Sequence, residues 1–219
     1  MNPVLHGLDL NDLIYGSPNM DQVEKINKKG KALKAFLEDP DAQKHFLNTP
    51  PPKNVSPEMR KELEDLKYRT EHITPQDREF GQKCEDSIIN VWIEFLYNNG
   101  ISVPKSWFHD VEHHTDGLLY YIKYHYNRPR PFQIGCYYKL DIYRPIYTDA
   151  NCAAYPSGHA FLATLFYKIL GDKYPHAKEK MNKFHKKIME SRLACGVHYA
   201  SDVKFGEELA NWVYSKQLF

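Results

Sequence analysis

Apolar residues recur at intervals of three and four along most of the chain. One such series contains Phe80, Cys84, Ile88, Val91 and Phe95, and another contains Phe205, Leu209, Trp212 and Val213. This spacing is typical of helices that bury one face. Few segments alternate apolar and polar residues with the period of a strand, so the pattern predicts an all-α helical bundle.

Capping signals predict where the helices begin and end. Ser56-Pro57-Glu58 and Thr74-Pro75 each offer an N-cap followed by proline at the first helical position, and Gly100 is a plausible stop for the series that begins at Thr74. Asn127 to Pro156 is expected to form a loop. The remaining helices are expected at about 104–126, 158–173, 176–194 and 202–216.

Three consecutive prolines between Leu47 and Pro57 divide the chain, since they cannot continue a helix. We expect residues 1–56 to form an N-terminal helical arm with a proline-rich connector, and residues 57–219 to form a helical core. The two parts together are expected to make one compact domain. The arm has helical spacing at Val23, Ile26, Gly30, Leu33 and Leu37. A packing helix is the simpler interpretation, and a partner-binding helix is the alternative.

Length and charge narrow the class of protein. The chain has 219 residues and a formal net charge of +1, with 11 Phe, 16 Tyr and 3 Trp to build a core. Without a basic excess, a nucleic acid polymer or an anionic membrane is not expected as a partner. The longest nearly apolar run, Ala160 to Tyr167, is far shorter than the roughly 20 residues of a spanning helix.

The start of the chain and its cysteines indicate the compartment. The sequence from Met1 to Gly16 lacks a basic segment followed by an apolar one. We therefore expect no secretory signal and a cytoplasmic location. Cys84, Cys136, Cys152 and Cys195 form no Cys-x-x-Cys pair. We expect free thiols in a reducing compartment, with a disulfide as the alternative.

Candidate chemistry is concentrated in three clusters: KYHYNRPRP (123–131), YPSGHAF (155–161) and SRLACGVHYASD (191–202). Lys123, Arg130 and Arg192 are cations suited to phosphate oxygens. Ser157 and Gly158 precede an apolar helix, where the hydroxyl and backbone N–H groups can point at an anion. Together these residues predict a site for a phosphate group.

Two histidines supply groups for proton transfer or nucleophilic attack. Asp202 lies four residues after His198, near the start of the last predicted helix, where it can accept from one imidazole nitrogen and leave the other free. One oriented histidine suits a nucleophile, and the other, His159, suits a general acid. Phosphoryl transfer needs mainly positioning and charge stabilisation, which Lys and Arg provide without a metal.

The spacing of these residues resembles the signature of the type 2 phosphatidic acid phosphatase and vanadium haloperoxidase superfamily. That signature is Lys, six residues, Arg-Pro; then Pro-Ser-Gly-His; then Ser-Arg, five residues, His, three residues, Asp. Every position is matched between Lys123 and Asp202. The neighbouring sequence is most similar to the soluble bacterial class A non-specific acid phosphatases. The resemblance implies a helical bundle of the acid phosphatase and vanadium-dependent haloperoxidase type.

The resemblance also implies a role for each residue. His198 would attack phosphorus and form a phosphohistidine, Asp202 would orient His198, and His159 would protonate the leaving oxygen and later activate water. The equatorial oxygens would be held by Lys123, Arg130 and Arg192, with Ser157 and the Gly158 N–H completing the site.

Several other residues have open assignments. Arg128 and Tyr155 are candidate substrate contacts, although the family spacing selects Arg130, and Tyr155 is one of many tyrosines expected mainly to pack. Ser191 is expected to be structural. A metal site is conceivable at His113, His114 and His125 with Asp110 and Asp116. We favour surface or pocket-lining histidines there and predict no metal in the site.

The leading hypothesis is therefore a soluble, metal-independent phosphatase acting on phosphomonoesters or nucleotides. It needs no cofactor, and vanadate is expected to bind as a phosphate mimic. The predicted partner is a small soluble phosphorylated substrate, with homo-oligomerisation left open. The alternatives are a vanadium-dependent haloperoxidase and a non-catalytic protein that binds phosphate ligands. A lipid phosphatase is disfavoured because such relatives generally carry transmembrane helices.

Overall fold

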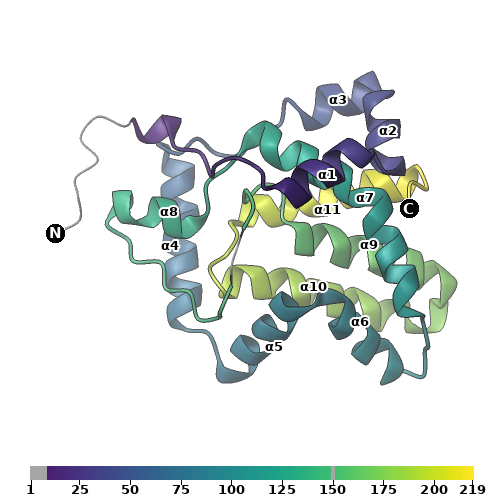
Figure 1. Ribbon diagram of the computed structural model, residues 1–219. Coiled ribbons are helices and arrows are strands. Elements are labelled where there is room, and N and C mark those ends of the chain that lie inside the picture. The colour runs from purple at the N-terminus through teal and green to yellow at the C-terminus, as the bar shows by residue number, and fades with distance from the viewer. Residues whose placement is uncertain (1–8, 149–150) are drawn as a thin grey trace.

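The computed structural model of the protein describes residues 9–148 and 151–219, and every regular element in these ranges is helical (Figure 1). The predicted all-α class is therefore confirmed. The α-helices are α1 (Met20–Lys28), α2 (Lys31–Leu37), α3 (Pro40–Phe46), α4 (Pro57–Glu71), α5 (Pro75–Asp86), α6 (Ile88–Tyr97), α7 (Lys105–Tyr126), α8 (Pro131–Ile134), α9 (Gly158–Lys173), α10 (Lys178–Ala194) and α11 (Ala200–Ser215). Short 3₁₀ turns are η1 (Leu10–Asp12), η2 (Gly135–Tyr138) and η3 (Pro175–Ala177).

The predicted helix starts are fixed by side-chain caps. The Ser56 hydroxyl accepts a hydrogen bond from the Met59 N–H at 3.1 Å and begins α4. Thr74 begins α5 in the same way, accepting from the Asp77 N–H at 3.1 Å. Each cap satisfies one of the N–H groups that the first turn of a helix leaves unpaired.

The arm does not form the single helix that its spacing predicted. It breaks between α1 and α2, where Lys29 adopts a left-handed conformation with φ of 45°. Gly30 follows, and a Cβ atom there would lie 2.6 Å from the carbonyl oxygen of His114 and 2.7 Å from that of His113. The break thus lets the backbone of the arm approach α7 at a distance that only glycine permits.

The helix expected from Thr74 to Gly100 is also divided. Ser87 is extended, with φ of −169°, and its hydroxyl accepts from the Asn90 N–H at 3.1 Å to begin α6. The apolar spacing continues across this break, which is why the sequence predicts one helix. The predicted loop from Asn127 to Pro156 likewise contains two short helical pieces, α8 and η2.

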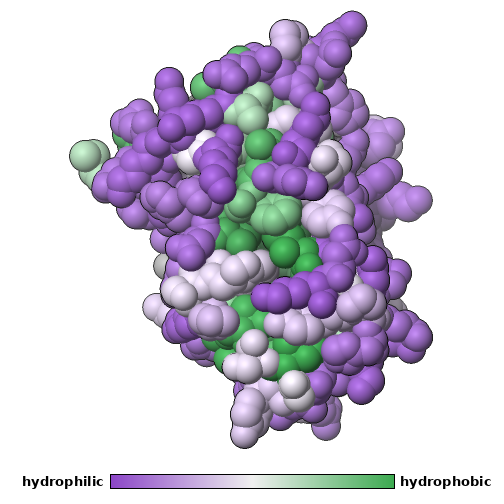
Figure 2. All heavy atoms as spheres, turned by 90° about the vertical axis from the view of Figure 1, so that its right-hand side faces the viewer, coloured by the Kyte–Doolittle hydropathy of each residue, from purple (hydrophilic) through white to green (hydrophobic). Residues whose placement is uncertain are grey.

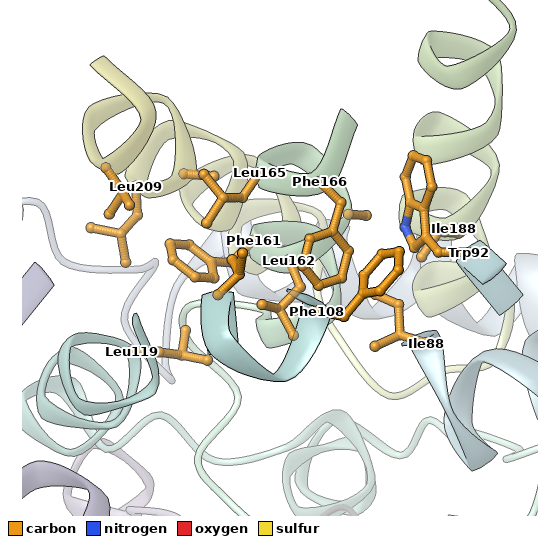
Figure 3. Packing of buried hydrophobic residues seen from close by; sticks show 14 of the residues in the cluster. Ile88, Trp92, Phe108, Leu119, Phe161, Leu162, Leu165, Phe166, Ile188 and Leu209 are labelled. Carbon is orange, nitrogen blue, oxygen red and sulfur yellow. The ribbon is translucent and has the colours of Figure 1, made fainter. Parts of the chain in front are cut away.

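The centre of the core is α9, which packs between α10 and α11. Its residues Phe161, Leu162 and Phe166 lie toward Phe108 of α7 and Trp92 of α6 (Figure 3). The rings of Phe108 and Phe166 meet edge to face with centroids 4.9 Å apart, a favoured aromatic geometry. Burial on all sides explains why the run from Ala160 to Tyr167 is almost wholly apolar.

The arm packs on the rest of the molecule, since α1 and α2 both lie against α7 (Figure 1). Phe36 of α2 meets Trp212 of α11 edge to face at 5.8 Å. The arm therefore shares the main hydrophobic cluster with the later helices. The boundary proposed between residues 56 and 57 remains a prediction.

The face on the right of Figure 1 is shown in Figure 2. Hydrophilic residues cover most of it, and a band of hydrophobic residues runs down its middle. Within the described ranges, none of the helices combines the length and the apolar character that crossing a membrane would require.

Candidate active site

The three sequence clusters meet at one cavity of about 420 Å³. Six of the predicted site residues line it: Lys123, Arg130, Gly158, His159, Arg192 and His198. They come from the end of α7, the start of α8, the start of α9, the end of α10 and the turn before α11. The folding of the bundle thus brings together side chains that are separated by up to 75 residues in the chain.

His198 is held from both sides of its ring. Its Nδ1 lies 3.1 Å from Asp202 Oδ2, and its Nε2 lies 3.1 Å from Arg130 Nη1. A guanidinium can only donate, so Nε2 is an acceptor and Nδ1 carries the proton shared with Asp202. Contrary to the expectation from the sequence, the lone pair of Nε2 is therefore not free but accepts a hydrogen bond from Arg130 at the cationic end of the cavity.

The surroundings keep His198 neutral. Burial, together with the charges of Arg130, Lys123 and Arg192, holds its pKa well below the ordinary value of a histidine. Asp202 is held in turn by the N–H of Tyr199 at 2.9 Å, at the first turn of α11.

Lys123 and Arg130 are anchored by backbone carbonyls. Lys123 Nζ donates to the oxygens of Ala153 and Pro156 at 2.7 and 2.6 Å. Arg130 donates from Nε to Cys152 O at 2.8 Å and from Nη1 to Val197 O at 2.7 Å. Burial lowers the pKa of Lys123 to about 8, and the charge of Arg130 acts in the same direction. Both cations are therefore fixed in position before any ligand arrives.

Arg192 has donors that no other described residue satisfies. Its Nη2 pairs with Glu85 of α5, whereas its Nε and Nη1 are buried without a hydrogen-bond partner in the described ranges. Only 1% of the residue is exposed, and buried unpaired donors of this kind are costly. An anion in the cavity would accept these hydrogen bonds, which is the role predicted for Arg192.

His159, in the first turn of α9, lines the cavity together with Arg192 and Glu85. Its Nε2 donates to the carbonyl oxygen of Cys84 at 3.0 Å, which leaves Nδ1 as the nitrogen available for proton transfer. Burial and then the charge of Arg192 lower its pKa to about 3, although Glu85 acts in the opposite direction.

Two predicted site residues lie just behind the cavity lining. Asp202 is fully buried beneath His198, consistent with its predicted orienting position. The Ser157 hydroxyl accepts from the Ala160 N–H at 3.4 Å as the N-cap of α9, and Ser157 is not among the cavity-lining residues. Ser191 donates to Ile188 O at 2.7 Å, the local contact expected of a structural residue.

The two candidate substrate contacts, Arg128 and Tyr155, are not among the residues that line this cavity. Arg128 is 2% exposed and lies behind Asp202, to which its Nη1 donates at 2.5 Å. Tyr155 stacks on Phe205 with centroids 4.3 Å apart and donates to Thr49 O at 2.9 Å. Arg128 pairs with the buried carboxylate of Asp202, and Tyr155 packs in the aromatic core. Neither side chain therefore lines the cavity.

Other residues that line the cavity were not predicted as site residues from the sequence. Glu85 pairs with Arg192, and the pKa of Glu85 is lowered by the charge of Arg192 even though burial opposes this. The Sγ of Cys152 lies 3.3 Å from Arg130 Nη2. Burial raises the pKa of this thiol, but the charges of Lys123 and Arg130 outweigh burial and lower it. No motif marks these residues, because only tertiary contacts bring them to the site.

The alternative metal site has no support in geometry. Within residues 9–148 and 151–219, no group of three or more His, Cys, Asp or Glu side chains is arranged to hold a metal ion. Of the residues considered for such a site, Asp116 lines the cavity, where it pairs with Lys25 of α1 at 3.3 Å.

Comparison with known proteins agrees with the geometry. Residues 115–210 match the family model described as PAP2 superfamily, a range that contains all three clusters. A non-specific acid phosphatase of Salmonella typhimurium is 27% identical over 174 residues, covering 74% of this chain and 68% of the relative. That of Salmonella typhi is 27% identical over 179 residues, with the same coverage. The predicted resemblance is thereby confirmed.

Proposed function

We propose that this chain, which carries a PAP2 superfamily region over residues 115–210, is a phosphatase that forms a phosphohistidine at His198 and needs no metal. The comparisons support the broader class, a phosphoric ester hydrolase. The observation that carries the finer proposal is the placement of His198, held between Asp202 and Arg130 at the cationic end of the cavity.

The reaction divides into two steps. In the first, Nε2 of His198 forms a bond to phosphorus while the bond to the leaving oxygen breaks, and His159 gives that oxygen a proton. Asp202 stabilises the positive charge that develops on the His198 ring. In the second step His159 takes a proton from water, the water oxygen bonds to phosphorus, and the bond to Nε2 breaks to release phosphate.

Charge stabilisation would come from the protein itself. Lys123, Arg130 and Arg192 surround the position that the phosphoryl oxygens would occupy, and the unpaired donors of Arg192 would bind two of them. Fixed cations in a buried site are effective because they need no reorganisation during the reaction. Vanadate would bind in the same place and inhibit.

Substrate binding would also supply the proton that His159 must donate. The pKa of His159 is lowered to about 3 by burial and by Arg192. A phosphate dianion offsets the charge of Arg192 and favours the charged imidazolium, so its arrival raises this pKa. Binding and protonation of the general acid are thereby coupled.

Release of phosphate from p-nitrophenyl phosphate in EDTA tests the proposal. Activity should persist in EDTA, fall with vanadate, and be lost in His198→Ala. The control is His125→Ala, which removes an exposed histidine of α7 that does not line the cavity. Full activity in His198→Ala would show that the nucleophile is assigned wrongly, and bromination of a dye with vanadate and peroxide would favour the haloperoxidase alternative. A cytoplasmic location and a small soluble substrate complete the proposal.

A further inference from the structure

One side of α7 lines the cavity over four turns. The lining residues on this helix are His109, Glu112, Asp116, Leu119, Tyr120 and Lys123. Their spacing of three, four and seven residues places them along a single stripe of the helix. The cavity therefore extends from the phosphate site at Lys123 back along α7 toward His109.

The stripe fixes the distance between the two ends of the cavity. A helix rises about 1.5 Å per residue, so Asp116 lies about 10 Å along the axis from Lys123, and Glu112 lies about one turn further. A phosphate ester bound at the cationic end would place its leaving group along this part of α7. The side chains around Asp116 are thus in position to select the leaving group.

This far end carries an excess of negative charge. Lys25 Nζ of α1 lies 3.3 Å from Asp116 and also 3.3 Å from Asp21. His109 Nδ1 lies 3.2 Å from Glu112 Oε2. The cavity lining thus sets two carboxylates against one lysine, which Asp21 outside the lining also shares, and one histidine, so negative charge is in excess while the imidazole is neutral.

The same carboxyl groups are partly withdrawn from water. The side chains of Asp116 and Glu112 are 19% and 26% exposed. Burial raises the pKa of both groups, and the charge of Asp116 raises that of Glu112 further. A cation that reached this end would relieve the repulsion between the two carboxylates.

A second observation points to a ligand in this cavity. The Nε and Nη1 groups of Arg192 are buried without partners in the described ranges, at the other end of the same cavity. The cavity thus has a cationic end with unsatisfied donors and an acidic end two helical turns away.

We propose that the substrate is a phosphate monoester whose leaving group carries a primary ammonium about 10 Å from phosphorus, held by Asp116 with Glu112. The proposal rests on the proposed phosphatase function. An ammonium group fits better than a hydroxyl because it neutralises the excess charge, whereas a hydroxyl only donates a hydrogen bond. Lys25, contributed by the N-terminal arm, competes for Asp116 and limits how strongly the amine is bound.

The test compares phosphate esters of similar length. 6-Aminohexyl phosphate has the required ammonium, n-heptyl phosphate replaces it with a methyl group, and 6-hydroxyhexyl phosphate replaces it with a hydroxyl. We expect kcat/KM for the amine to exceed that of either neutral ester by about tenfold, as befits a hydrogen-bonded ion pair. Asp116→Asn should reduce this ratio to near one, and Lys25→Met should increase it. The control, Asp110→Asn, changes an exposed α7 carboxylate outside the cavity lining and should keep the ratio.

Each outcome bears on the inference. The ratio compares substrates within one variant, so it does not depend on how much of that variant folds. Equal rates for all three esters, or a ratio unchanged by Asp116→Asn, would overturn the proposal, and a preference for the hydroxyl ester would point to a sugar-like leaving group instead. Absence of any hydrolysis of p-nitrophenyl phosphate by the unaltered protein would overturn the phosphatase function itself.

Discussion

Arg128 donates a hydrogen bond to Asp202 across 2.5 Å, on the side of the carboxylate opposite His198. The Nη2 atom of Arg128 pairs with Glu62 Oε2 of α4 at 2.7 Å, and its Cζ atom lies 3.8 Å from the ring centroid of Tyr199. We therefore expect the arginine that the sequence offered as a substrate contact to position Asp202 instead.

Replacing Arg128 with Met should impair turnover more than binding. Asp202 would lose the partner that fixes its orientation, so kcat should fall about tenfold or more while KM changes little. Two buried carboxylates would also lose their counter-ion, which typically costs about 3–5 kcal/mol of stability. Steady-state kinetics and urea unfolding measure the two effects. Glu62→Gln, which leaves the contact with Asp202 intact, is the control and should lower stability with a much smaller change in kcat.

Alkaline pH should weaken the reaction of the free enzyme with substrate. The Lys123 pKa of about 8 means that its charge is present below this pH and is lost as the pH rises through it. The ester remains a dianion above its own second pKa of about 6, so the change reports the enzyme. Proton uptake by His159 already makes kcat/KM fall as the pH rises, and we expect this fall to steepen above pH 8, with kcat flatter because bound phosphate stabilises the charged lysine. A pH profile that does not steepen up to pH 9 would contradict this role.

Loss of His159 should depend on the leaving group. An alkoxide needs a proton as it departs, whereas p-nitrophenolate departs without one. His159→Gln should therefore slow hydrolysis of an alkyl phosphate by about 10²–10⁴-fold and that of p-nitrophenyl phosphate much less. Measured side by side, equal losses for the two substrates would argue against a general acid at this position.

Gly30→Ala should destabilise the protein without touching the site chemistry. The new methyl group would lie within 2.6–2.7 Å of two backbone oxygens of α7, and backbone cannot move aside cheaply. A loss of about 1–3 kcal/mol in urea unfolding is expected for overpacking of this kind. Lys29→Ala, at the exposed neighbouring position, is the control and should change stability by less than about 0.5 kcal/mol. An unchanged unfolding midpoint in Gly30→Ala would show that α1 and α2 do not need this close approach.

The sequence predicted much of the local structure because its signals are local. Ser56, Thr74 and Ser157 cap helices through hydrogen bonds to residues three positions away, and such contacts form whatever the rest of the chain does. The same applies to the pair His198 and Asp202, which a four-residue spacing brings together at the start of α11. Breaks such as those at Ser87 and Lys29 were missed because apolar spacing continues across them.

The helical class, the three clusters and the chemistry of their side chains can thus be read from the amino-acid sequence. The packing of the helices is what places Arg128 against Asp202, Glu85 beside Arg192, and Lys25 of the arm in the cavity beside Asp116. These contacts join residues far apart in the chain, between 74 and 107 positions. No local pattern encodes such pairs, because they exist only once packing around α9 has fixed where each helix lies.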